Sequence, residues 1–102
     1  DLKKFTESQK RLSDINMRYN QLNSQSWDIK RDQKSISDTL LGLKNIKSKT
    51  ADSLRNQLIE RQKSNDKKLE EIMTQTYELT VEKSELEMTI KTLNRTLQYT
   101  RS

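Results

Sequence analysis

The sequence predicts an all-α fold, a coiled coil or helical bundle, from three observations. Its 102 residues contain no proline and one glycine, Gly42, and these two residue types are the ones that usually interrupt helices. Leucine and isoleucine recur at steps of three and four residues, which is the period of one helix face. The apolar positions form a narrow strip, here called the seam, which a helix must bury against other helices. We therefore predict one long continuous helix, or two helices with a soft joint, within an assembly.

The first half of the chain carries a regular heptad pattern over residues 12–43, with Leu12 at position a. Leucine and isoleucine fill the d positions more often than the a positions. This repeat is typical of helices that pack as a coiled coil. The apolar residues that we expect in this part of the seam are Leu12, Ile15, Tyr19, Leu22, Ile29, Ile36, Leu40 and Leu43.

The weakest helical stretch lies at residues 20–27, which are rich in asparagine, serine and glutamine. Because serine is a strong helix cap, Ser24 or Ser26 is a candidate cap for a new helix that begins near Trp27. The heptad phase nevertheless continues through this stretch, which favours a continuous helix with at most a soft joint here. Gly42 costs about 1 kcal/mol relative to alanine in a helix, and we expect the helix to continue through it.

Residues 69–100 carry a second heptad pattern, shifted by one residue relative to the first. The central segment 43–69 accounts for the shift if it contains two stutters, each an insertion of four residues into the heptad repeat. The segment then approximates an 11-residue repeat, which locally relaxes the supercoil. We therefore predict a single coiled-coil rod segment over residues 1–102, packed more nearly straight in its middle, as suits a bundle or filament. The seam residues expected in these two parts are Leu54, Leu58, Leu69, Ile72, Leu79, Leu86, Ile90, Leu93 and Leu97.

Polar residues interrupt the seam often. Buried polar groups in a coiled coil cost stability but fix register and partner choice. Two interpretations stay open: the seam is poor and only partly buried, or neighbouring chains in a heteromeric assembly supply matching polar groups. The polar residues in question are Ser26, Gln33, Lys47, Gln62, Asn65, Thr76 and Lys83.

The composition excludes a globular domain with a large core. Hydrophobic residues make up 29% of the chain and charged residues 34%, whereas an average domain is roughly 45–50% apolar. A fully helical chain of this length would be about 150 Å long, because each residue adds about 1.5 Å. No apolar run approaches the roughly 20 residues that cross a bilayer, so we expect no membrane partner. The start at Asp1, without a leader, suggests a segment of a longer chain.

The net charge of +5 arises entirely in the first half of the chain. The basic residues are spread around the helix and mixed with acidic ones, which indicates a solvated face. A nucleic-acid partner would require a dense basic stripe with aromatic residues, so we expect none. A mildly basic helix still favours an acidic partner surface.

Nothing in the sequence predicts an enzyme. Without histidine or cysteine, a catalytic base would have to be Asp, Glu or Lys, and clusters such as Glu82, Glu85 and Glu87 lie on an exposed helix that leaves their pKa values untuned. We expect no catalytic, cofactor-binding or metal-binding residues and no cofactor. The absence of cysteine fits a reducing compartment such as the cytoplasm.

Trp27 is the most distinctive side chain and falls beside the seam on the heptad phase. Tyr77 and Tyr99 flank the second heptad pattern in the same way. Each is interpreted either as a residue that flanks the core or as an anchor in a partner's pocket, because aromatic side chains contribute strongly to interfaces. Trp27 is the candidate partner anchor.

Residues 35–57 resemble the second coiled-coil half of the tektins. A serine-led helix over 35–41 runs into a Thr-Ala-x-x-Leu-Arg-x-Gln pattern at residues 50–57, and Trp27 corresponds to an upstream tryptophan. Residues 68–71 and 77–79 are similar to the Leu-Glu and Glu-Ile steps of the same helix. The cysteine-bearing nonapeptide associated with tektins is not within these 102 residues, and Leu58-Ile59 follows where the family usually has an asparagine step.

The resemblance implies a structural filament protein that stabilises ciliary or flagellar doublet microtubules from inside the lumen. Its partners would be other coiled-coil chains, in a homo- or hetero-oligomer, together with tubulin and other microtubule inner proteins. Its location would be the cytoplasm and cytoskeleton, in the axoneme of a cilium or flagellum. The alternative is a dimeric coiled-coil adaptor or tether of the kinetochore or vesicle-tethering type.

Overall fold

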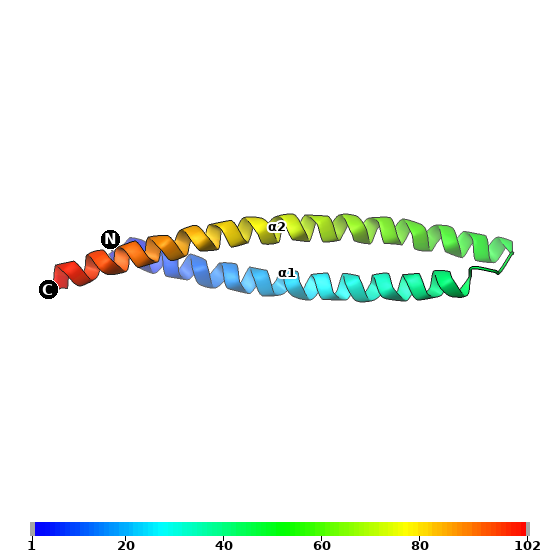
Figure 1. Ribbon diagram of the computed structural model, residues 1–102, viewed down its shortest axis with the longest axis horizontal. Helices are drawn as coiled ribbons and strands as arrows, with labels where there is room; N and C mark the ends of the chain where they lie inside the picture. Colours follow the sequence, from blue (N-terminus) through cyan, green and yellow to red (C-terminus); the bar gives the residue numbers. More distant parts are fainter. Residues whose placement is uncertain (1, 102) are drawn as a thin grey trace. The chain divides into compact units, whose positions relative to one another are not determined.

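The computed structural model describes the backbone of residues 2–101 and the side chains of residues 2–99. Two helices account for nearly all of these residues: α1, Leu2–Gly42, and α2, Lys49–Arg101 (Figure 1). No strand occurs in this part of the chain. The prediction of an all-α fold is confirmed.

The two helices contribute to two compact units. One unit combines the part of α1 up to Leu22 with the part of α2 from Thr74 onward. The other unit consists of Asn23–Met73 and is a helical hairpin, in which the end of α1 and the start of α2 run antiparallel on either side of a short turn (Figure 1). Each unit is therefore a pair of helices in which the chain packs against itself.

The turn between the helices begins directly after Gly42. The backbone N–H of Leu43 donates to the carbonyl oxygens of both Thr39, at 3.0 Å, and Leu40, at 3.2 Å, which tightens the end of α1. The N–H of Ile46 then donates to the carbonyl of Leu43 at 3.1 Å. The prediction that the helix continues through Gly42 is wrong. The bond from Leu43 to Thr39 is the last of the helical kind, and bonds to the third residue back then replace the helical ladder and turn the chain back.

Ser48 caps the start of α2. Its side-chain Oγ accepts a hydrogen bond from the backbone N–H of Ala51 at 3.1 Å, which satisfies one of the free donors at a helix N-terminus. Asp52 lies in the first turn of the helix, where a negative charge is favourable. The serine cap that we considered at Ser24 or Ser26 is therefore found at Ser48 instead.

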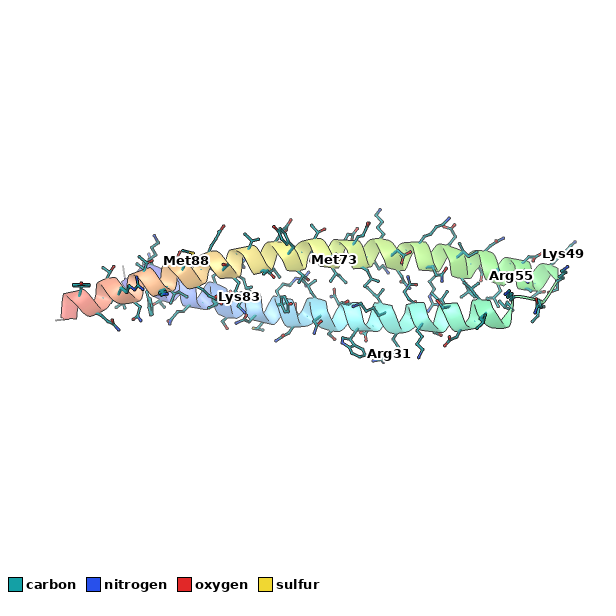
Figure 2. The ribbon with its side chains drawn as sticks, in the orientation of Figure 1. Arg31, Lys49, Arg55, Met73, Lys83 and Met88 are labelled. Atoms are coloured by element: carbon teal, nitrogen blue, oxygen red, sulfur yellow. The ribbon has the colours of Figure 1, made fainter. Side chains whose placement is uncertain are left out.

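Arg55 closes the turn from the α2 side. Its Nη2 donates to the carbonyl oxygen of Leu43 at 2.9 Å and to that of Ile46, and its Nη1 forms an ion pair with Asp52. A cation at the last carbonyls of a helix is favourable for the helix dipole and satisfies free acceptors. Figure 2 shows Arg55 beside the turn. One side chain thus links the end of α1 to the first turns of α2.

Helix α1 runs unbroken through residues 20–27, so the soft joint expected there is at residues 43–48 instead. Leu22 is 1% exposed and Ser26 is half-buried, so this stretch faces the partner helix directly. Most helical stability in proteins comes from packing an apolar face rather than from intrinsic propensity. The burial of Leu22 therefore compensates for the poor helix formers around it.

Between Ala51 and Leu79 the seam of α2 is a regular heptad repeat without stutters. From Ala51 to Leu79, the buried and half-buried positions alternate strictly in steps of four and three. Within the predicted central segment, Arg55 takes the place expected for Leu54, and Lys47 lies in the turn. The two predicted stutters are therefore wrong. The one-residue shift between the two heptad patterns lies across the turn, where the chain leaves the helix and no phase has to be kept.

We expect the Gly42→Ala variant to be about 0.5–1 kcal/mol more stable than the parent chain. The φ angle of Gly42 is not positive, and a Cβ built on it meets no atom within 4 Å, so alanine fits without strain. Alanine also reduces the conformational entropy of the unfolded chain. Urea denaturation followed by far-UV circular dichroism measures the difference. A loss of stability would show that the turn requires glycine.

Candidate functional site

The predicted seam is the contact surface between the helices of each unit. Ile15, Leu22, Ile36 and Leu58 are buried, while Tyr19 and Leu54 are the two members that remain exposed, at 43% and 38%. The other eleven predicted seam residues are half-buried: Leu12, Ile29, Leu40, Leu43, Leu69, Ile72, Leu79, Leu86, Ile90, Leu93 and Leu97. The covering helix belongs to the same chain, whereas the sequence led us to expect neighbouring rods.

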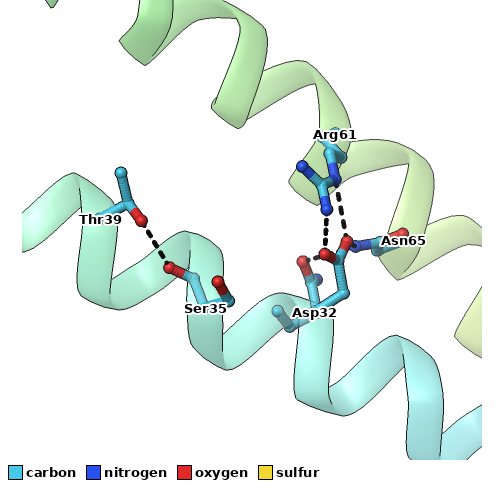
Figure 3. A network of polar contacts seen from close by, with 6 residues as sticks. Asp32, Ser35, Thr39, Arg61 and Asn65 are labelled. Carbon is cyan, nitrogen blue, oxygen red and sulfur yellow. Dashed lines mark hydrogen bonds and ion pairs between the residues drawn. The ribbon is translucent and has the colours of Figure 1, made fainter.

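A polar layer crosses the seam in the hairpin unit and consists of Asp32, Gln33, Arg61, Asn65 and Asp66. Asn65 is 6% exposed, and its Nδ2 donates to Asp32 Oδ2 at 2.8 Å and to Gln33 Oε1 at 3.2 Å. Arg61 Nε donates to the same Asp32 oxygen at 3.0 Å, and Arg61 Nη2 pairs with Asp32 Oδ1 (Figure 3). The carboxylate of Asp32 is thus held by two residues of the facing helix.

Gln33 connects this layer to a second carboxylate. Its Nε2 donates to Asp66 Oδ1 at 2.8 Å and to the backbone carbonyl of Gln62 at 3.3 Å. No buried side-chain nitrogen or oxygen in the described part of the chain lacks a partner. The buried polar atoms of the layer are therefore all hydrogen-bonded, which is the condition under which buried polar groups specify a structure rather than weaken it.

Sequence analysis found two of the five residues of this layer. Gln33 and Asn65 were recognised as polar seam residues, and their partners come from the other helix of the same chain. Asp32 and Arg61 were missed because they lie one residue before the seam positions Gln33 and Gln62. The signal that would have found them is their opposite charge at equivalent heptad positions. Lys47 and Lys83 are exposed, as expected if the seam is only partly buried.

The unit that contains the N-terminal part of α1 has its own pairs along the edge of the seam. Arg11 donates to both oxygens of Glu82, at 2.6 and 2.9 Å, and Arg18 Nη2 donates to Gln75 Oε1 at 3.1 Å. As the residue number rises along α1, that of its partner falls along α2, so the two helices are antiparallel. The Arg11 and Glu82 side chains are 50% and 39% exposed, so solvent screens their attraction.

Two carboxylates have lowered pKa values because of these contacts. The pKa of Asp32 lies below its ordinary value of 3.8, chiefly through the hydrogen bond from Asn65 and then through that from Arg61. The pKa of Glu82 lies below its ordinary value of 4.5, chiefly through the hydrogen bond from Arg11. Each contact favours the ionised carboxylate in the folded chain.

We expect the free energy of unfolding to fall when the pH is lowered below about 4. A carboxylate with a lowered folded pKa stabilises the fold above its unfolded pKa, and this contribution is lost as the pH falls through the folded pKa. Urea denaturation at a series of pH values measures the effect. The double variant Asp32→Asn with Glu82→Gln should show a smaller fall. An identical fall in both proteins would contradict this assignment.

Trp27 is 65% exposed, so it does not flank the core. Tyr77 and Tyr99 are also exposed, at 69% and 85%. The structure places all three outside the seam.

The described residues contain no group of three or more His, Cys, Asp or Glu side chains placed to hold a metal ion. Neither helix, over the residues described, combines the length and apolar character needed to span a membrane. Comparison of the chain with models of protein families, with curated proteins and with solved structures found no match.

Proposed function

We propose that this chain is a structural coiled-coil protein of a filament or bundle, in which its helices pack against helices of neighbouring chains. One observation carries the proposal: the apolar seam of α2 is only half covered from Leu69 onward. On α1, Ile15 and Leu22 are each 1% exposed, whereas every leucine and isoleucine of the α2 seam from Leu69 to Leu97 is merely half-buried. Further helices would bury the remaining apolar surface, and such burial is the main driving force for association.

Large apolar side chains outside the seam support the same proposal. Met73, Tyr77 and Met88 on α2 are each about 70% exposed. Single exposed apolar residues are ordinary on protein surfaces, but a series of them on one helix is characteristic of a contact surface. A structural protein uses such contacts without needing a pocket or a catalytic group.

The resemblance to tektins supplies the finer form of the proposal. In that form the chain stabilises doublet microtubules of cilia or flagella from inside the lumen, beside tubulin and other microtubule inner proteins. The residues that support it are those at 35–57 and the upstream Trp27. In the structure these residues form the hairpin turn and the helix segments on both sides of it.

Biochemical fractionation of ciliated cells that express the tagged full-length protein tests this proposal. We expect the chain to remain with the doublet microtubules after extraction with detergent and high salt. The Leu79→Asn variant should be released, because it places an amide in the half-covered seam, while Ser64→Asn, at an exposed position of the same helix, should be retained. Release of the parent chain into the soluble fraction would overturn the axonemal proposal.

Sedimentation of the purified chain distinguishes a filament component from a dimeric adaptor or tether. Weak, concentration-dependent self-association is expected for a filament component. A dimer whose mass does not change with concentration would favour the adaptor or tether instead.

A further inference from the structure

The turn of the hairpin carries a compact basic and apolar surface, here called the turn patch: Leu41, Lys44, Ile46, Lys47 and Lys49. Leu41 is 70% exposed and Ile46 is 48% exposed. All three lysines are exposed, and none of the ion pairs found among the described residues involves them. Residues 40–51 contain no acidic side chain. Figure 2 shows Lys49 at the turn, next to Arg55.

A shallow, open hollow adjoins the turn patch. Its lining combines the leucine side chains of Leu40 and Leu41 with the cationic groups of Lys44 and Arg55, and Ser37 and Gln62 complete it. The charge of Arg55 is already used by Asp52 and by the carbonyl oxygens of the turn. The charge of Lys44 is not. A hollow lined by leucine side chains and an available lysine cation suits an aromatic or apolar side chain that has carboxylates beside it.

The outer face of α2 offers those side chains, in a surface here called the acidic strip: Tyr77, Glu78, Val81, Glu85 and Met88. Tyr77, Val81 and Met88 are 69%, 41% and 70% exposed, and their spacing of four and seven residues places them on one helix face. Glu78 and Glu85 lie along the same side of that face, seven residues apart. Neither takes part in an ion pair found within the described residues.

We propose that the turn patch of one copy of this chain binds the acidic strip of a second copy. The two surfaces match in chemistry: each presents exposed apolar side chains beside unpaired charges, and the signs are opposite. Because the surfaces differ, the contact is heterologous, and repeated contacts of this kind generate open filaments or rings. This inference rests on the proposed function and names the neighbouring chain as a second copy.

Charge reversal in the full chain tests the proposal by sedimentation velocity over a concentration series. We expect Lys44→Glu with Lys47→Glu, and separately Glu78→Lys with Glu85→Lys, each to weaken self-association about tenfold or more, because two attractive pairs become repulsive. An equimolar mixture of the two variants should recover the parent's association. In the mixture, the reversed turn patch of one variant can bind the reversed acidic strip of the other, because their charges are again opposite. The unchanged turn patch and the unchanged acidic strip also attract each other.

The matched control for the lysine variant is Lys3→Glu with Lys10→Glu, which makes the same change in net charge as Lys44→Glu with Lys47→Glu at exposed positions of α1 outside both surfaces. It should associate as the parent does. Circular dichroism of each variant confirms that helix content is kept. In addition, Tyr77→Ser should weaken association while Ser84→Ala, on the same helix, should not.

Three results would overturn the inference: a parent chain that stays monomeric, charge-reversed variants that associate as the control does, or a mixture that does not recover association. Cross-linking of the turn patch to a different protein in the native assembly would also overturn it. If the parent remains monomeric in solution but stays with extracted filaments, the proposed function stands and the second copy is the wrong neighbour.

Discussion

We expect the Ile36→Ala variant to unfold with a free energy about 2–4 kcal/mol below that of the parent chain. Ile36 is 2% exposed and lies in the hairpin unit, where α1 meets the start of α2. Alanine removes three carbon atoms from a buried site and leaves a cavity that the neighbouring helix can fill only in part. The loss is a large part of the stability available to two packed helices, because net stabilities of whole domains are only about 5–15 kcal/mol.

Urea denaturation of dilute protein, followed by far-UV circular dichroism, measures this loss. Met17→Ala is the matched control, because Met17 lies on the same helix but is 61% exposed. It should change the free energy of unfolding by no more than about 0.5 kcal/mol. Equal effects of the two substitutions would mean that Ile36 is not a core residue and that the seam is not the contact surface.

The second large effect is expected at Asn65. Replacing it with alanine should cost about 1–3 kcal/mol, because two acceptors on the facing helix, at Asp32 and Gln33, lose a donor in a place that water reaches poorly. Removing one partner from a satisfied polar layer is costly for this reason, while the net value of the layer itself is small.

Asn56→Ala serves as the control for Asn65→Ala, because Asn56 is an exposed residue of the same helix in the same unit. It should be neutral or slightly stabilising, since alanine is the better helix former. The double variant Gln33→Leu with Asn65→Leu should recover much of the lost stability by making the two seam positions of the layer apolar, while Asp32 keeps its ion pair with Arg61. If Asn65→Ala is as harmless as Asn56→Ala, the hydrogen bonds of the layer do not stabilise the fold.

The seam illustrates how much of the fold was predictable. The positions of Ile15, Leu22, Ile36 and Leu58 in the core followed from heptad spacing, because a helix face is a local property of the sequence. The identity of the covering helix was not predictable in this way. A heptad pattern specifies that a face must be covered, and a helix of the same chain covers it as well as a neighbouring chain does.

The turn illustrates the opposite case. Gly42 alone lowers helix stability by about 1 kcal/mol, which does not distinguish a helix end from an interior glycine. The position at which α1 ends depends on contacts that form only once the chain has turned back. The main ones are the hydrogen bonds from Arg55 to the carbonyl oxygens of Leu43 and Ile46. Because we assumed an unbroken helix, we explained the one-residue shift between the two heptad patterns by two stutters. These stutters do not occur.

By itself, the sequence determined that this protein is helical and which face of each helix packs against a partner helix, with Tyr19 and Leu54 as the exceptions, because both follow from the spacing of apolar residues along the chain. Only the tertiary structure decided where the chain reverses, that Asp32 and Arg61 join Gln33 and Asn65 in one polar layer, and that Trp27 is exposed. These features depend on how residues of the two helices are paired. A local sequence pattern does not specify which residue of one helix will contact a given residue of the other.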